Sequence, residues 1–325
     1  MLADSPHGIV LAFDFGGTKL AAAIIDKASG QIHRYQVTST PPIPDSQTCL
    51  NAIISLGGQL IESASGLAVN AIGVSFGGPV SSDGLTVIKS QHIAGWEHFP
   101  LPQVISSHFG LPVFMENDAN AAALGEWYYG AGERLPSLVY LQTSTGIGAG
   151  MIINGRIYHG KGMAGEFGHL TIEANGLPCA CGKSGCLESY SSGWGIASRA
   201  RQIYPRLPAD SALRALTQGD PHQVTTELVF AAYLQQDPHM RELVRSAMGS
   251  LARALVDVVC LLDPHRIVIG GGMSQSYWIM LAEMQPFINQ FMPPFLRGHL
   301  DLRASSLGGK ETLLGAALLT EEQFH

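Results

Sequence analysis

The fold is decided by GIVLAFDFGGTKLAAAIIDKASGQIHRYQV, residues 8–37. This stretch contains the three runs IVLAFDF, LAAAIID and QIHRYQV, which are separated by the turn-forming segments GGTK and KASG. Apolar and β-branched runs that are bounded by such segments predict three consecutive strands. The residues that follow predict, in order, a helix over 45–66, a buried strand over 70–76, a strand over 111–117 and a helix over 118–132.

The same pattern returns in the second half of the chain. Residues 137–160, SLVYLQTSTGIGAGMIINGRIYHG, again predict strand, Gly/Thr turn, strand, tight turn and strand. The second turn is Asn154–Gly155, and this dipeptide is a strong hairpin signal. Further helices are predicted over 189–204, 209–218, 222–236, 238–263, 275–290 and 309–322, with strands over 265–273 and near HLDLRA. We therefore predict an α/β chain with two copies of one unit of the type β-β-β-α-β-α.

Composition and charge exclude several classes of protein. The chain has 325 residues and a net charge of −7. An acidic chain without a basic run argues against a nucleic-acid partner. The N-terminal sequence lacks the pattern of a signal peptide, and no apolar run is long enough to cross a bilayer, so we expect a cytoplasmic protein without a membrane partner. Cys49 and Cys260 lie in apolar helical contexts and are expected to be buried thiols.

The other cysteines are clustered in residues 165–189. Cys179, Cys181 and Cys186 have the spacing C-x-C-x₄-C, which alone leaves a redox-active or partly disulfide-bonded group open. His169 completes a Cys₃His set, which is a common combination for structural zinc. A reducing compartment also favours metal binding over disulfide formation. The cluster therefore predicts a zinc site.

Glycine-rich turns recur at three places where backbone N–H groups could approach an anion. DFGGTK, residues 14–19, and TSTGIGAG, residues 143–150, follow the first strand of each copy, and IGGG, residues 269–272, ends a later strand. Two such turns could hold a polyphosphate, and the third could lie against a purine. Asp14 could bind Mg²⁺, which prefers oxygen ligands. The alternative is that each is an ordinary tight turn.

Carboxylates at strand and loop ends are the candidates for catalysis and for sugar recognition. In ENDANAAALGE, Asp118 follows a predicted strand and is either the N-cap of the next helix or a general base, with Asn117 beside it. Glu166 and Glu188 flank the cysteine cluster. They are either solvated loop carboxylates or acceptors for sugar hydroxyls.

Taken together, these stretches resemble the ROK family of repressors, open reading frames and sugar kinases. The ordered set is DFGGTK, SFGGPV, ENDANAAALGE, STGIGAG, GEFGH, CACGKSGCLE and IVIGGG, and it covers nearly the whole chain. The resemblance implies two ribonuclease H-like domains, as in actin-like ATPases, with a cleft between them. The expected small domain covers residues 1–117 and is completed by a helix within about 304–325. The expected large domain covers 118–303 and contains the predicted zinc site within residues 165–189, which we call the zinc loop.

The resemblance also implies roles for individual residues. Asp118 matches the catalytic base, while the sugar would be bound by Asn117, Glu166, His169, Glu188, Gly77 and Gly78. Mg²⁺ and ATP would be bound by Asp14, Gly16, Gly17, Thr18, Lys19, Thr145, Gly146, Gly148, Gly271 and Gly272. Structural Zn²⁺ would be bound by His169, Cys179, Cys181 and Cys186.

The function that this resemblance implies is ATP-dependent phosphorylation of a hexose at its 6-hydroxyl, with glucose as the favoured substrate. N-acetylmannosamine, N-acetylglucosamine, mannose and fructose remain open as acceptors. Two other classes are weighed, a sugar-responsive repressor and a catalytically inactive sugar sensor. No helix-turn-helix segment precedes Asp14, and the presence of Asp14 and Asp118 argues against the sensor. The resemblance suggests a homodimer. His92 departs from the family, which usually has asparagine there.

Overall fold

The protein is described by a computed structural model that covers residues 8–41, 44–64, 66–90, 93–321 and 324. Its first sheet has the strand order β3-β2-β1-β4-β5. The strands are β1 (Ile9–Phe15), β2 (Lys19–Asp26), β3 (Gln31–Ser39), β4 (Val69–Phe76) and β5 (Val113–Asn117). The strands β1, β2 and β3 pair antiparallel, and β4 and β5 extend the sheet in parallel with β1. The predicted meander of residues 8–37 is therefore present.

The second sheet repeats this order. It runs β10-β9-β6-β7-β8, so that β6, β7 and β8 take the places of β1, β2 and β3. The strands are β6 (Ser137–Thr143), β7 (Ile147–Ile153), β8 (Arg156–Ile157), β9 (Arg266–Gly270) and β10 (Leu302–Ala304). Because both sheets follow the same order, the duplication that the sequence predicted is confirmed.

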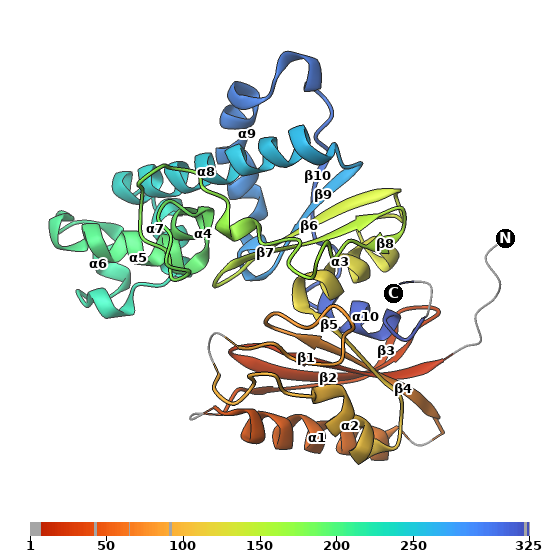
Figure 1. Ribbon diagram of the computed structural model, residues 1–325. Helices are drawn as coiled ribbons and strands as arrows, with labels where there is room; N and C mark the ends of the chain where they lie inside the picture. Colours follow the sequence, from red (N-terminus) through yellow and green to blue (C-terminus); the bar gives the residue numbers. More distant parts are fainter. Residues whose placement is uncertain (1–7, 42–43, 65, 91–92, 322–323, 325) are drawn as a thin grey trace. The chain divides into compact units, whose positions relative to one another are not determined.

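The helices connect the strands in the same sequence in both copies (Figure 1). The first copy has α1 (Ser46–Ser63), α2 (Leu101–Phe109) and α3 (Asp118–Tyr129). The second copy has α4 (Leu187–Ser191), α5 (Gly193–Ile203), α6 (Ala212–Leu216), α7 (Thr226–Leu234), α8 (Pro238–Leu262), α9 (Tyr277–Phe291) and α10 (Glu311–Leu318). In the described part of the chain, no helix is long and apolar enough to cross a membrane.

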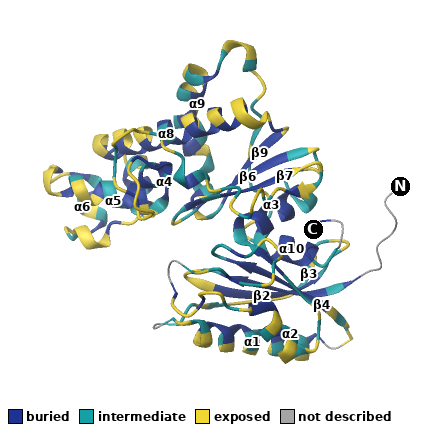
Figure 2. Cartoon of the chain, viewed as in Figure 1, coloured by how far each residue is buried: buried dark blue, intermediate teal, exposed yellow. Residues whose placement is uncertain are grey.

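Alternation along β1 divides the first core into two layers. Leu11 and Phe13 point to one face, where they join apolar side chains of α1 and α2. Val10 and Ala12 point to the other face, where they pack with α10. The strand β1 is buried from Val10 to Phe15, and Figure 2 shows its neighbours β2 and β4 mostly in dark blue. Since successive strand residues face opposite sides, Asp14 belongs to the face that α10 covers.

The chain divides into two compact units. The first contains residues 1–140, 150–165 and 305–325, and the second contains 141–149 and 166–304. In this division residues 118–140 group with the first unit, whereas the sequence led us to begin the large domain at 118. The assignment of functional domains stays a prediction. The C-terminal helix α10 packs against β1, β2 and β4 of the first sheet.

Three details differ from the sequence-based expectations. The helix α2 was not predicted, because LPQVISSHF follows the cluster of turn residues 94–100 and is short. The predicted helix 189–204 is divided at Ser192, whose extended backbone caps α5. Cys49 is buried as expected. Cys260 is exposed, because the last turn of α8 lies at the surface, where Leu261 is exposed as well.

Candidate active site

Asp14 is a buried carboxylate at the end of β1. Ser75 Oγ donates to its Oδ1 at 3.0 Å, and Thr312, from α10, donates to the same carboxylate. Burial, reinforced by the negative charge of Asp118, raises the pKa of Asp14 to about 6. A buried acid beside a second acid is a position that a bound cation would stabilise. The structure therefore fits the prediction that Asp14 binds Mg²⁺, a role that stays a prediction.

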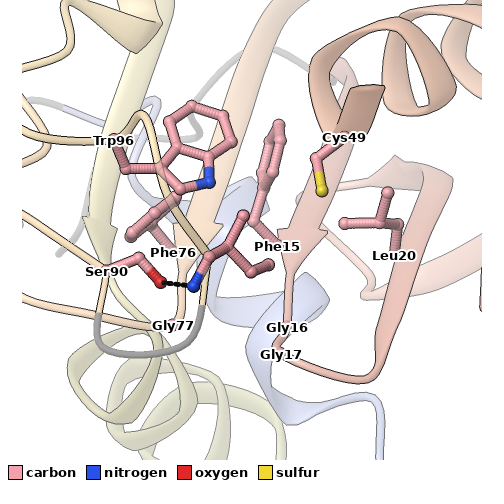
Figure 3. A pocket seen from close by; sticks show the side chains of 10 residues that line it. Phe15, Gly16, Gly17, Leu20, Cys49, Phe76, Gly77, Ser90 and Trp96 are labelled. Carbon is pink, nitrogen blue, oxygen red and sulfur yellow. Dashed lines mark hydrogen bonds between the residues drawn. The ribbon is translucent and has the colours of Figure 1, made fainter. Parts of the chain in front are cut away.

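The turn after Asp14 is a tight hairpin that rests on aromatic side chains. Gly16 N donates to Lys19 O at 3.1 Å, which closes the turn. Phe15 and Phe76 contact Trp96 edge to face at 5.7 and 5.2 Å between ring centroids. These rings line a cavity of about 10 Å³ with Gly16, Gly17 and Gly77, as Figure 3 shows. The turn therefore rests on an apolar support of packed aromatic rings.

The junction of β5 and α3 presents Asn117 and Asp118. The N-cap of α3 is Asn117, whose Oδ1 accepts from the backbone of Ala119 and Asn120. The suggestion that Asp118 is the N-cap is therefore wrong. Asn117 Nδ2 donates to Gly78 O and to Asp118 Oδ1, at 3.1 Å each. Asn117 therefore caps the helix and also donates a hydrogen bond to the carboxylate of Asp118.

The loop after β4 lies close to this junction. Gly77 N donates to Phe15 O at 2.9 Å, so the loop is tied to the end of β1. A Cβ atom at Gly77 would lie 3.0 Å from Phe15 O and 3.8 Å from Asp118 Oδ2. The first unit thus brings Asp14, Gly77, Asn117 and Asp118 together at the same edge of its sheet.

In the second unit, the predicted zinc ligands converge. The ligand atoms of His169, Cys179, Cys181 and Cys186 all lie within 4.8 Å of one another. The Sγ atoms of Cys181 and Cys186 are 3.7 Å apart, which is too long for a disulfide and matches two thiolates on one tetrahedral Zn²⁺. Burial raises the pKa of the Cys186 thiol to about 12, so its thiolate needs a nearby cation. The donor set therefore fits zinc.

The ring of His169 presents its two nitrogens to different partners. Nδ1 lies 3.8 Å from Cys179 Sγ, and Nε2 lies 3.7 Å from Glu166 Oε2. A metal on Nδ1 would leave Nε2 as a proton donor on the side of Glu166. The structure thus brings His169 and Glu166 together, and their role in binding a sugar stays a prediction.

Glu188 has a contact that the sequence did not suggest. Its Oε2 accepts from Ile147 N at 3.1 Å, in the turn between β6 and β7. Two further hydrogen bonds join the start of α5 to this turn, from Gly193 N to Ser144 O at 2.8 Å and from Trp194 N to Thr145 O at 3.0 Å. The zinc loop and the second glycine turn are therefore one hydrogen-bonded assembly.

The third glycine patch follows β9 and closes against the same turn. Gly271 has a φ of 81°, and a Cβ atom there would lie 2.5 Å from Thr143 O. Thr143 Oγ1 donates to Gly270 O at 2.9 Å. The structure thus brings Gly271 next to the strand that ends in the second glycine turn, whereas Gly272 has open space on its Cβ side.

Several residues of this region were not predicted from the sequence. Ser75 and Thr312 are distant in sequence from Asp14, and no pattern links them to it. Glu116 could have been noticed, since a charged residue at the end of a buried strand needs a partner. His92, whose role the sequence left open, lies outside the described residues.

Comparison with known proteins identifies the family. The sequence matches the family model described as the ROK family over residues 10–323. A glucokinase of Streptomyces coelicolor is 33% identical over 97% of this chain and 98% of its own length. An N-acetylmannosamine kinase of Escherichia coli O1:K1 / APEC is 31% identical over 96% of this chain and 98% of its own. The chain belongs to the ROK family.

A solved structure agrees with this result. The crystal structure of a ROK family glucokinase from Streptomyces griseus, in complex with glucose and AMPPNP, superposes with a TM-score of 0.84. It is 33% identical in sequence, and the match covers 96% of this chain and 99% of that one. The predicted family and the predicted fold class, a duplicated actin-like ATPase fold, are confirmed.

Proposed function

We propose that this protein transfers the γ-phosphoryl group of ATP to the 6-hydroxyl of a hexose, and that the hexose is glucose. Its enzyme class, an ATP-dependent sugar kinase, is that of the glucokinases and N-acetylmannosamine kinases that match it over almost their whole length. The observation that supports the reaction best is the β5–α3 junction. There Asp118 is oriented by Asn117 and lies beside the Gly77 loop.

In this proposal Asp118 accepts the proton of the attacking hydroxyl as the new O–P bond forms. Such general-base assistance contributes roughly 10²–10⁴-fold in rate. Phosphoryl transfer otherwise depends on positioning and on charge neutralisation. The turns at 16–19 and 145–148, with Gly271 and Gly272, would bind the nucleotide. Mg²⁺ held by Asp14 would neutralise phosphate charge.

Each unit has residues that are proposed to bind the sugar. In the first unit Asn117, Gly77 and Gly78 lie around Asp118. In the second unit the zinc set would hold the ring of His169, so that its Nε2 could donate a hydrogen bond to a sugar hydroxyl. The carboxylates of Glu166 and Glu188 could accept hydrogen bonds from sugar hydroxyls. Here zinc supplies a fixed loop geometry. The small domain at 1–117 and 304–325, the large domain at 118–303, the homodimer and the cytoplasmic location remain predictions.

The experiment that tests this function is a coupled ADP-release assay over glucose, mannose, fructose, N-acetylglucosamine and N-acetylmannosamine. We expect the highest kcat/KM with glucose. Asp118→Ala should lower kcat by about 10²-fold or more in a protein that still folds, because the side chain acts on the substrate and is not part of the apolar core.

Each result has a distinct reading. A higher kcat/KM with an N-acetylhexosamine would overturn glucose as the substrate but not the kinase. An Asp118→Ala protein with the kcat of the wild type would remove Asp118 from the reaction. If no sugar in the panel stimulates ADP release, the protein is not the sugar kinase that we propose.

A further inference from the structure

We propose that Glu116 and His159 form a positioning pair that fixes the catalytic carboxylate of Asp118. The proposal rests on the proposed function, because it assumes that Asp118 is the base. Glu116 immediately precedes the Asn117–Asp118 dipeptide on β5, and His159 lies in the segment after β8. Neither residue carries a role in the reaction proposed above.

Glu116 is the point where three segments meet. Its Oε1 accepts from Asn117 N at 2.7 Å and from Asn120 Nδ2 at 3.1 Å. Its Oε2 lies 2.5 Å from His159 Nε2. One buried carboxylate thus joins the end of β5, the first turn of α3 and the segment after β8. The His159 ring must keep its Nε2 toward Glu116 for this arrangement to persist.

The hydrogen bonds continue from Glu116 to the proposed base. The backbone N–H that Glu116 binds belongs to Asn117, whose Nδ2 donates to Asp118 Oδ1 at 3.1 Å. Ala119 N donates to the same oxygen at 2.9 Å. With two donors on Oδ1, the carboxylate plane of Asp118 is set, and its Oδ2 is the oxygen beside Gly77. A shift of the Asn117 backbone would therefore rotate the base.

The burial of Glu116 explains why a hydrogen-bond donor is needed at this place. The Glu116 side chain is 9% exposed, and a buried carboxylate is costly unless it is paired and hydrogen-bonded. His159 is the ionisable side chain that contacts it, and their hydrogen bond raises the pKa of His159. Removing His159 takes away the hydrogen bond that Oε2 of this buried carboxylate receives. The expected response is a movement of Glu116 toward solvent, which withdraws its support from Asn117 N.

The test compares three variants by steady-state kinetics with the preferred sugar of the wild type. His159→Ala should lower kcat by about 10- to 100-fold, because small misplacements of a catalytic group cost that much, with the KM for ATP within about 2-fold. His159→Gln keeps a donor near the Nε2 position and should recover kcat to within about 3-fold of the wild type. His299→Ala breaks a histidine–carboxylate pair of similar type, with Asp263 at 3.0 Å on the surface, and should leave kcat unchanged.

The outcomes separate this proposal from the proposed function. An active wild type with a normal kcat for His159→Ala would overturn the positioning role alone. Failure of His159→Gln to recover kcat would also overturn it, because a donor to Glu116 would then not be what matters. A loss confined to thermal stability, with kcat intact below the melting temperature, would mean a structural role only. A wild type without sugar-dependent ADP release would overturn the kinase and, with it, the base that the pair is proposed to position.

Discussion

At the scale of single residues, the carboxyl group of Asp14 lies where its surroundings disfavour the ionised form. Asp14 is buried on the face of β1 that α10 covers, next to the negative charge of Asp118. Its pKa rises from an ordinary value of 3.8 to about 6. The folded state therefore binds the Asp14 proton more tightly than the unfolded chain does. Stability is lost as the pH rises from about 4 to about 6, and the ionised form remains costly above that range.

We predict that Asp14→Asn stabilises the magnesium-free protein and abolishes turnover. A shift of about two pKa units corresponds to about 3 kcal/mol, which is the upper limit of the gain in unfolding free energy at pH 7.5. The gain should be much smaller at pH 4.5, where Asp14 is protonated. Urea unfolding at both pH values measures it, and Asp210→Asn, at an exposed position, is the matched control. An equal gain at both pH values would show that ionisation of Asp14 is not its cause.

Individual residues were predictable from sequence to different degrees. The zinc ligands lie within eighteen positions of one another, so local spacing was enough to predict that they converge. The partners of Asp14 and Glu116 were not predictable. Ser75 is 61 positions from Asp14, and His159 is 43 positions from Glu116. Such pairs depend on strand pairing and helix packing, which a single sequence does not specify.

At the scale of elements, the zinc loop and the second glycine turn form one assembly. Since the sequence placed only proposed sugar ligands around the zinc site, loss of the metal was expected to weaken sugar binding far more than ATP binding. The hydrogen bond from Ile147 N to Glu188, together with those from Gly193 and Trp194 to the turn, changes this expectation. Glu188 follows Cys186 by two residues. A loop released by metal loss would therefore also release a support of the turn proposed to bind phosphate.

We predict that Cys181→Ala weakens the binding of both substrates. Zinc content should fall below one equivalent, since a structural zinc site needs its full ligand set. The sugar KM should rise about 10-fold or more, and ATP affinity should fall by about 3- to 10-fold through Glu188. Metal analysis, isothermal titration with a non-hydrolysable ATP analogue and kinetics measure these effects. Cys260→Ala, at an exposed thiol on α8, is the control. Unchanged ATP affinity in a zinc-free Cys181→Ala protein would contradict the coupling through Glu188.

At the scale of the whole molecule, the duplication was readable from the sequence, whereas the packing of the C-terminal helix on the first unit was expected only from the family resemblance. Strand order repeats because the same run of strands and turns occurs twice. However, α10, at the end of the second copy, covers the first sheet and packs closely on α3. Both helices contain small residues: α3 is rich in alanine, and α10 contains the run Gly-Ala-Ala. Small residues allow close approach but do not say which helix approaches.

Gly315 is the point of closest approach, and it provides the last prediction. A Cβ atom there would lie 1.6 Å from Ala121 O, so Gly315→Ala must push α10 away from α3. Overpacking of this kind costs about 1–3 kcal/mol or more. Gly58→Ala, in α1, places its Cβ in open space and should instead add about 0.5–1 kcal/mol, because alanine favours the helix. Urea midpoints of the two variants should move in opposite directions from the wild type. If Gly315→Ala were as stable as Gly58→Ala, the close packing of α10 on α3 would not hold in solution, and the C-terminal helix would not complete the first unit.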